Sequence, residues 1–230
     1  VACLTSVSFF TDRVKRATAL QATELLAADL VLISSQQVDE SYISLAQDIG
    51  LTYSLNESFR SVVMKGDKLE LTEVKAVDEQ YPIRGELRIT NRLFGEEEII
   101  DTIPAVGHVW ADSRLLQILQ AELGDTIELG ASTLTIDKII SYEPDRGGDL
   151  FNIAPRLLMN RADLDATGLI LPGSRVQYRL LLGGSTEAIS QYQQSINIKD
   201  NDNIRIQSIK DARPEIRTAL ERAEQFLGLA

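Results

Sequence analysis

Residues 30–50, LVLISSQQVDESYISLAQDIG, define the first structural unit of the chain. Leu30 to Ser34 form a short apolar run, which is typical of a buried strand. From Asp39 to Ile49 the apolar side chains recur at helical spacing, and Gly50 supplies a C-terminal stop. The stretch therefore predicts a strand followed by a helix, and the helix residues expected to face the core are Tyr42, Leu45, Ala46 and Ile49.

Two strands are predicted after this helix, over residues 53–64 and 69–77, and leucine alternates with glutamate in the second. A comparable order returns later as a strand over 176–182, a turn at Gly183-Gly184, a helix over 185–196 and a strand over 204–209. Similar order without similar sequence indicates two halves of one sheet. A split β-α-β sandwich with its helices on one face accounts for both units.

A smaller β-rich insertion is predicted between the two units, over residues 84–148. Asp112 is a plausible cap for a helix that Gly124 would close. Two alternating strands follow over 126–129 and 133–140, joined by a short turn that contains glycine. The apolar residues expected on the helix are Leu115, Leu116, Leu119 and Leu123.

Both ends of the chain predict amphipathic helices, over residues 7–28 and 211–226, because apolar side chains recur there at helical spacing. The opening stretch, VACLTSVSFFT, has no charge, and the last five residues are also apolar. No uncharged run approaches the roughly 18 residues that are needed to cross a bilayer.

Composition excludes several classes of function. The chain is 44% hydrophobic and 25% charged, as ordinary globular proteins are. Its net charge of −11 opposes binding to nucleic acid, so we expect no nucleic-acid partner. Cys3 is the only cysteine, which excludes an internal disulfide and a cysteine-based zinc site.

No catalytic constellation is found in the sequence. His108 is the only histidine, and no GxSxG motif accompanies it. A hydrolase built on His108 would need a carboxylate and a hydroxyl within hydrogen-bond reach of the ring. A structural or surface role is the better interpretation of this residue. We therefore expect no catalytic residue, cofactor or metal site.

Residues 144–149, PDRGGD, form an unusual stretch where the insertion would rejoin the main sheet. Two glycines and two aspartates lie here around one arginine, and glycine pairs suit backbone bending. We interpret the stretch as a hinge or a tight contact between subdomains. The candidate hinge residues are Asp145, Arg146, Gly147 and Gly148.

Several phrases resemble a known family, and they extend over nearly the whole chain. In chain order they are SVSFFTDRV (6–14), VKAVDEQYPIRGEL (74–87), GHVWADSRLL (107–116), LGDTIELG (123–130), YEPDRGGDLFNIAPRLLMN (142–160) and ATGLILPGSRVQYRLLLGG (166–184). Together they resemble the extracytoplasmic domain of FtsX-like ABC transporter permeases of the MacB superfamily, and most closely the YbbP-like branch. Each phrase alone is weak, and their order makes the combination specific.

The resemblance implies an α+β domain inserted between the first two transmembrane helices of a permease. Residues 1–83 and 149–230 would form an α/β "porter" subdomain, and residues 84–148 a β-rich "sabre" subdomain. The terminal helices would be stalks, so the uncharged opening would be the outer end of a membrane helix. The residues expected to pack stalk against stalk are Val14, Ala17, Ala219 and Ala223.

The resemblance also implies a mechanism without chemistry in this domain. A separate cytoplasmic subunit would bind and hydrolyse ATP, and the domain would transmit the conformational change on the periplasmic side of the inner membrane. The expected partners are that subunit, a second ectodomain or periplasmic protein, and a hydrophobic or amphiphilic cargo. The alternative is a stand-alone soluble module for a hydrophobic ligand, which predicts a mostly apolar cavity of ~300 Å³ or more.

Overall fold

The computed structural model describes residues 26–146, 154–196 and 204–208. Its strands are β1 (Leu30–Ser34), β2 (Thr52–Lys65), β3 (Lys68–Val77), β4 (Leu87–Thr90), β5 (Glu98–Ile100), β6 (His108–Asp112), β7 (Thr126–Leu129), β8 (Ser132–Tyr142), β9 (Arg156–Asn160), β10 (Val176–Gly183) and β11 (Ile204–Ser208). Its helices are α2 (Glu40–Ile49), α3 (Ser113–Leu119) and α4 (Thr186–Ser195), with 3-10 turns η1 (Pro144–Arg146), η2 (Arg161–Asp163) and η3 (Asp165–Thr167).

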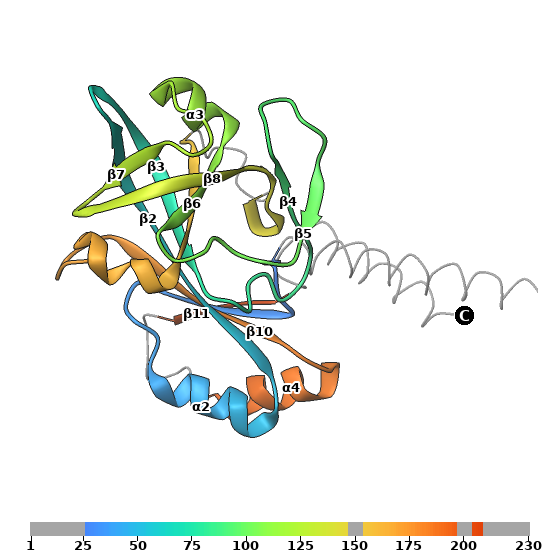
Figure 1. Ribbon diagram of the computed structural model, residues 1–230. Coiled ribbons are helices and arrows are strands. Elements are labelled where there is room, and N and C mark those ends of the chain that lie inside the picture. The colour runs from blue at the N-terminus through green and yellow to red at the C-terminus, as the bar shows by residue number, and fades with distance from the viewer. Residues whose placement is uncertain (1–25, 147–153, 197–203, 209–230) are drawn as a thin grey trace, which may run out of the picture.

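The described strands belong to one mixed sheet of eleven strands (Figure 1). Their order is β11-β1-β10-β2-β3-β9-β6-β8-β4-β5, and β7 pairs with both β2 and β8. Helices and strands thus occur together without regular alternation along the chain, and the sheet dominates. The predicted α+β class is confirmed.

The two predicted β-α-β units are present and interleave in the sheet. β10 lies between β1 and β2, and β1 lies between β10 and β11. Every neighbouring pair among these four strands is antiparallel. The two strands of each unit are therefore parallel and separated by a strand of the other unit. Helices α2 and α4 cover the same face of these strands (Figure 1).

Local signals set both ends of helix α2, and its end at Gly50 was predicted. The Asp39 side chain accepts a hydrogen bond from the Ser41 backbone N–H, which satisfies one free donor of the first turn. Gly50 ends the helix in the left-handed conformation with φ of 83°, where a glycine carries no Cβ penalty. The helix buries Ile43 and Ala46 most deeply, so its inward face centres on a residue that the prediction omitted.

Strand β1 is buried on both faces, which explains its uninterrupted apolar run. Leu30 and Leu32 pack with the residues beneath α2 and α4. Val31 and Ile33 point to the opposite face, where they pack in a second cluster with Tyr81. A strand covered on both faces has no position at which a polar side chain would reach water.

The middle of the chain differs from the prediction in one helix. α3 begins at the predicted cap, since Asp112 accepts a hydrogen bond from the Leu115 backbone N–H at 2.9 Å. It ends at Leu119, because Gln120 adopts the left-handed conformation with φ of 49°. Leu123 and Gly124 therefore lie beyond the helix, and the predicted length was wrong.

The β7–β8 hairpin was predicted, and its glycine is required. A Cβ added at Gly130, where φ is 59°, would lie 2.2 Å from the Thr167 carbonyl oxygen. No residue with a side chain fits without displacing that backbone. By contrast, β4, β6 and β9 were not predicted, since each is at most five residues long and lacks a clear alternating pattern.

The predicted insertion over 84–148 shares the sheet and a core with the rest of the described residues. β6 pairs with β9, and β7 pairs with β2. Leu115 and Ile127 belong to the same buried cluster as Val63 and Val74. The division into residues 1–83 with 149–230 and residues 84–148 stays a prediction.

Apart from Leu26, Ala27 and Ala28, the predicted terminal helices lie outside the described residues. These include all four stalk residues, Val14, Ala17, Ala219 and Ala223. In the described ranges, no helix combines the length and the apolar character needed to span a bilayer.

Candidate functional site

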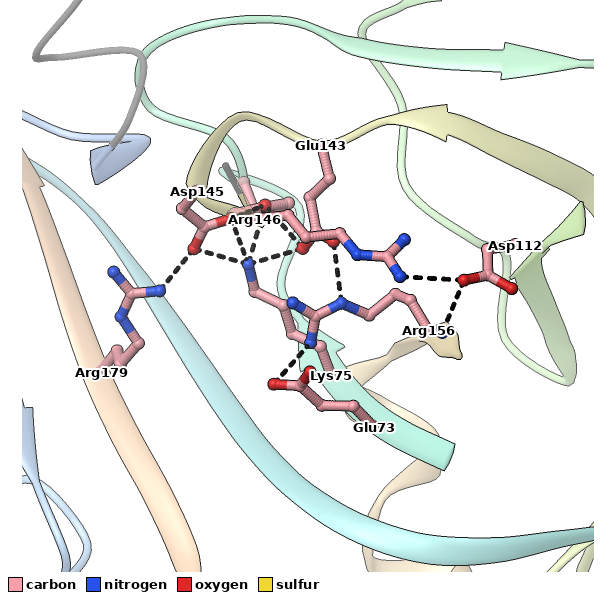
Figure 2. A network of polar contacts seen from close by, with 9 residues as sticks. Glu73, Lys75, Asp112, Glu143, Asp145, Arg146, Arg156 and Arg179 are labelled. Carbon is pink, nitrogen blue, oxygen red and sulfur yellow. Dashed lines mark hydrogen bonds and ion pairs between the residues drawn. The ribbon is translucent and has the colours of Figure 1, made fainter. Parts of the chain in front are cut away.

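A network of charged side chains lies buried where strands from distant parts of the sequence meet (Figure 2). It joins β3, the end of β6, η1 with the residue before it, β9 and β10. The members are Glu73, Lys75, Asp112, Glu143, Asp145, Arg146, Arg156 and Arg179, and the Tyr81 hydroxyl also takes part.

Lys75 is at the centre of the network and is only 1% exposed. Its Nζ donates to Glu143 Oε1 at 2.8 Å, to Asp145 Oδ1 at 2.6 Å and to the Tyr81 hydroxyl at 2.8 Å. An ammonium group has three N–H donors, so these contacts use its full capacity. The buried charge is therefore both paired and hydrogen-bonded, as burial requires.

Asp145 receives donors from three directions. Besides Lys75, the Tyr81 hydroxyl donates to Oδ1 at 2.6 Å and Arg179 Nη1 donates to Oδ2. Burial opposes ionisation, but Lys75 and Arg179 outweigh it and hold the pKa of Asp145 well below its usual range. Burial, together with the nearby carboxylates of Asp145 and Glu143, raises the pKa of Tyr81, so this phenol stays a donor.

Arg156 forms the second half of the network. Its Nε lies 2.9 Å from Glu143 Oε2, and its Nη1 lies 3.2 Å from Glu73 Oε1. Burial lowers the pKa of this guanidinium, but Glu143 and Glu73 outweigh burial and raise it. Burial likewise opposes ionisation of Glu143, yet Arg156 and Lys75 lower its pKa. Arg156 and Glu143 are therefore both charged at neutral pH.

Asp112 links the network to helix α3. Its Oδ1 accepts the Leu115 backbone N–H that begins the helix. Its Oδ2 accepts the Arg156 backbone N–H at 3.0 Å and Arg146 Nη2 at 2.9 Å. One carboxylate thus fixes the start of a helix, the start of β9 and the turn η1 relative to one another.

The charges in the network balance, with four carboxylates and four cations (Figure 2). Buried ion pairs add little net stability compared with apolar residues, but removing one partner is costly. Such a network therefore specifies one arrangement of its five elements and resists partial opening. The network therefore acts as a rigid connection between these elements. Its contacts do not suggest a catalytic step.

Two of the predicted hinge residues, Asp145 and Arg146, lie in this network, whereas Gly147 and Gly148 lie outside the described residues. A hinge at this point stays a prediction. Sequence reasoning missed Lys75, Arg156 and Arg179. Lys75 and Arg179 each interrupt apolar residues of a strand, and a charge in such a position was the available signal, whereas Arg156 is the first residue of β9.

His108 lies half-buried at the start of β6. Within the described ranges its Nδ1 is buried without a hydrogen-bond partner. The carboxylate that would orient a catalytic imidazole at that atom is therefore not found there. The described residues also contain no cluster of three or more side chains that could hold a metal ion.

An open groove of about 1050 Å³ lies over β1, β10, β2 and β3. The binding-module alternative predicts a mostly apolar cavity, but most of this lining is polar. The apolar members are Ile33, Phe59, Leu169 and Val176, and the polar members are Ser34, Ser35, Ser58, Arg60, Ser61, Glu73, Ser174, Arg175 and Gln177.

Comparisons with known proteins identify relatives of the chain. No family model matches it. It is 34% identical over all of its 230 residues to the uncharacterized ABC transporter permease YbbP of Escherichia coli K12, and it spans 28% of that protein's length.

Two solved structures are similar in fold. The periplasmic region of MacB from Actinobacillus actinomycetemcomitans has a TM-score of 0.50 and 13% identity, and the match covers 86% of this chain and 95% of that one. The extracellular domain of the transporter YknZ from Gram-positive bacteria has a TM-score of 0.50 and 8% identity, over 78% of this chain and 100% of that one. The chain is therefore similar over its whole length to part of the YbbP permease, which agrees with the predicted resemblance, and its fold is like that of the MacB and YknZ outer domains.

Proposed function

We propose that this chain is the extracytoplasmic domain of an ABC transporter permease and that it transmits an ATP-driven conformational change across the membrane. The observation that carries the proposal is the match of the whole chain to part of a permease, at 34% identity. The likeness of the fold to domains outside the membrane in two other transporters supports it. In this proposal the domain is not catalytic.

The buried charge network suits a domain that moves as a rigid body. Transmission requires packed elements that keep their arrangement while force is applied at one end. The contacts of Lys75, Asp145 and Arg156 join five elements, and breaking one buried pair costs about 3–5 kcal/mol. That cost exceeds the roughly 1–3 kcal/mol of a usual allosteric coupling, so the network would stay closed during transport.

The proposal places the domain on the periplasmic side of the inner membrane. A cytoplasmic ATP-binding subunit would act on it through membrane helices, and a second ectodomain or a periplasmic protein would be its outer partner. The cargo would be hydrophobic or amphiphilic. Force would enter through the stalk residues Val14, Ala17, Ala219 and Ala223, which lie outside the described residues.

Resonance energy transfer from a dye on the domain to acceptor lipids in the membrane tests the proposal. The sample is the full-length permease with its ATPase, held in a lipid nanodisc. Cys3 is replaced by serine, and a donor dye is attached after Ser41→Cys on the exposed side of α2. A second labelled protein carries Asp137→Cys on β8, which is also exposed. Acceptor lipids then report the height and tilt of the domain.

We expect transfer efficiency to differ between the nucleotide-free complex and the complex with a non-hydrolysable ATP analogue. Unchanged efficiency at both labels, in a complex with normal ATPase turnover, contradicts transmission through this domain.

The predicted stalk packing has its own test. Ala219→Lys should uncouple ATP hydrolysis from transport in the full complex, because a long charged side chain prevents close approach of two helices. Gln225→Lys, in the same predicted helix but outside the packing set, is the matched control. Equal transport by the two variants counts against packing at Ala219.

The predicted hinge is tested by replacing Gly147 and Gly148 together with alanine. Restricting the backbone there should slow transport while the ATPase still turns over. Normal transport by this variant removes the hinge from the proposal.

A further inference from the structure

Two arginines occupy neighbouring positions at one end of the β2–β10 strand pair and line the polar groove. The last cross-strand pair between β2 and β10 is Phe59 with Val176. Arg60 follows Phe59, and Arg175 precedes Val176, so both guanidinium groups belong to the same end of the strand pair. Both residues are exposed and both line the groove.

Neither arginine has a partner among the residues that the structure describes. No hydrogen bond or ion pair joins Arg60 or Arg175 to another described side chain. Glu73 lies opposite Arg60 on β3, but its carboxylate contacts Arg156 of the buried network (Figure 2). The charged residues of the groove lining thus carry one positive charge in excess, in a chain of net charge −11.

Like charges at neighbouring cross-strand positions repel each other, which an anion between them would relieve. The chemistry favours a phosphate-type oxyanion. A guanidinium presents a planar fork of donors that matches phosphate bidentately, and two forks can use oxygens that a single carboxylate does not have. Ser58 and Gln177, which are paired across the two strands and line the groove, supply further polar groups beside the arginines.

The groove is much larger than a phosphate ion, and the next rows on this face of the sheet are apolar. Side chains at positions 60, 62 and 64 of β2 point to one face because a strand alternates with period two. Val62 pairs with Leu71, and Met64 pairs with Leu69. These four side chains are 42%, 51%, 37% and 63% exposed.

We propose that the groove binds an anionic amphiphile, whose phosphate-type head is held by Arg60 and Arg175 and whose alkyl chain lies on the exposed pairs Val62–Leu71 and Met64–Leu69. The inference rests on the proposed function, because it gives the chemical class of the cargo. Exposed apolar patches of this kind often mark interaction sites on soluble domains. The two adjacent arginines favour the binding of a negatively charged head group.

Binding of three probes to the 230-residue chain tests this site. Octyl phosphate carries head and tail, inorganic phosphate carries the head alone, and octyl glucoside carries the tail with a neutral head. Each is titrated below its micellar concentration by calorimetry, and the arginine side-chain Nε–H resonances are followed by NMR. We expect octyl phosphate to bind at least tenfold more tightly than either other probe.

The double variant Arg60→Gln, Arg175→Gln should lose at least tenfold in affinity for octyl phosphate, whereas Arg92→Gln, an exposed control away from the groove, should not. The double variant Val62→Ser, Leu71→Ser should weaken octyl phosphate to the level of inorganic phosphate. Far-UV circular dichroism confirms that each variant is folded; the arginines are exposed, so their replacement leaves the unfolding midpoint unchanged or higher.

Equal binding of octyl phosphate by wild type and the arginine variant overturns the site, as does the absence of binding to wild type. Equal affinity for inorganic phosphate and octyl phosphate rejects the amphiphile and means that the site binds free phosphate instead. The nanodisc measurement with the arginine variant separates this proposal from the proposed function. An ATP-dependent change in energy transfer that persists in this variant preserves transmission even where the cargo site fails.

Discussion

Two sets of cations on the same face of the sheet have opposite surroundings. Lys75 and Arg179 point into the buried network, where carboxylates of Glu143 and Asp145 meet them at hydrogen-bond distance. Arg60 lies opposite Glu73 and one row away from Lys75 on β3, yet the Glu73 carboxylate contacts Arg156, and neither Arg60 nor Arg175 has a carboxylate partner in the described ranges.

The difference follows from burial. A charge withdrawn from water must be paired and hydrogen-bonded, or the fold is lost, so selection for folding is enough to explain the network. An exposed arginine is solvated and needs no partner, so folding places no demand on the groove. The network is therefore expected to matter for stability, and the groove for binding.

Lys75→Met gives the largest expected effect. Methionine keeps most of the buried volume but leaves the carboxylates of Glu143 and Asp145 short of one cation. The free energy of unfolding in urea should fall by about 3–5 kcal/mol. Lys68→Met, on the exposed end of the same strand, should change it by less than about 0.5 kcal/mol. Similar losses in the two variants would mean that burial does not distinguish these lysines.

The second-largest expected effect is a loss of stability in acid, which reports on the buried network. Folding lowers the pKa of Asp145 and Glu143, so their contribution to stability is present above about pH 4 and is lost as pH falls toward their folded-state values. Over this acidic range each such carboxylate adds up to about 1.4 kcal/mol per pH unit to the slope of stability against pH.

Urea unfolding at a series of pH values between about 5 and 2 measures that slope. Asp145→Asn should reduce it, because one carboxylate no longer titrates. The exposed control Asp137→Asn should retain the wild-type slope. A slope that is the same in wild type and Asp145→Asn contradicts the assignment.

Arg146→Ala should have an intermediate effect, because Arg146 is intermediate in exposure. Its side chain is 27% exposed, and Asp112 keeps its bonds to the backbone N–H groups of Leu115 and Arg156. We expect a loss of about 1–2 kcal/mol in the free energy of unfolding. A loss as large as that of Lys75→Met would place Arg146 among the fully buried partners. Arg92→Ala is the exposed control.

Arg175→Glu should give the smallest effect and the opposite sign. The change replaces a repulsive neighbour of Arg60 with an attractive one, so the unfolding free energy should rise by about 0.2–1 kcal/mol. The increase should shrink in high salt, because exposed charges are screened. A loss of stability instead would mean that Arg175 has a structural role that its exposure does not reveal.

Local pattern was enough to predict the two β-α-β units. An apolar run gave β1, and helical spacing with a C-terminal glycine gave α2, because these signals act within a few residues. The same reasoning failed for α3, where Gln120 ends the helix before the predicted glycine. It also missed β9, whose five residues carry no periodic signal of their own.

The candidate site could be predicted only in part. The PDRGGD stretch drew attention to Asp145 and Arg146, since its composition is unusual. Nothing in the sequence paired Asp145 with Lys75, which lies seventy positions earlier. Such pairs depend on which strands become neighbours, and that choice is made by packing over the whole chain.

The sequence alone determined the α+β class, the family resemblance and the approximate places of β1, α2, β2, β3, β10, α4 and β11. Those properties depend on periodicity, caps and turns, which are local. The tertiary structure alone decided that the strands of the two units interleave and that four carboxylates meet four cations where β3, β6, η1, β9 and β10 come together. It also left Arg60 and Arg175 side by side, with no partner among the residues that the structure describes. Charges separated by many residues find or miss each other only when the sheet assembles, because electrostatic contacts depend on distance in space.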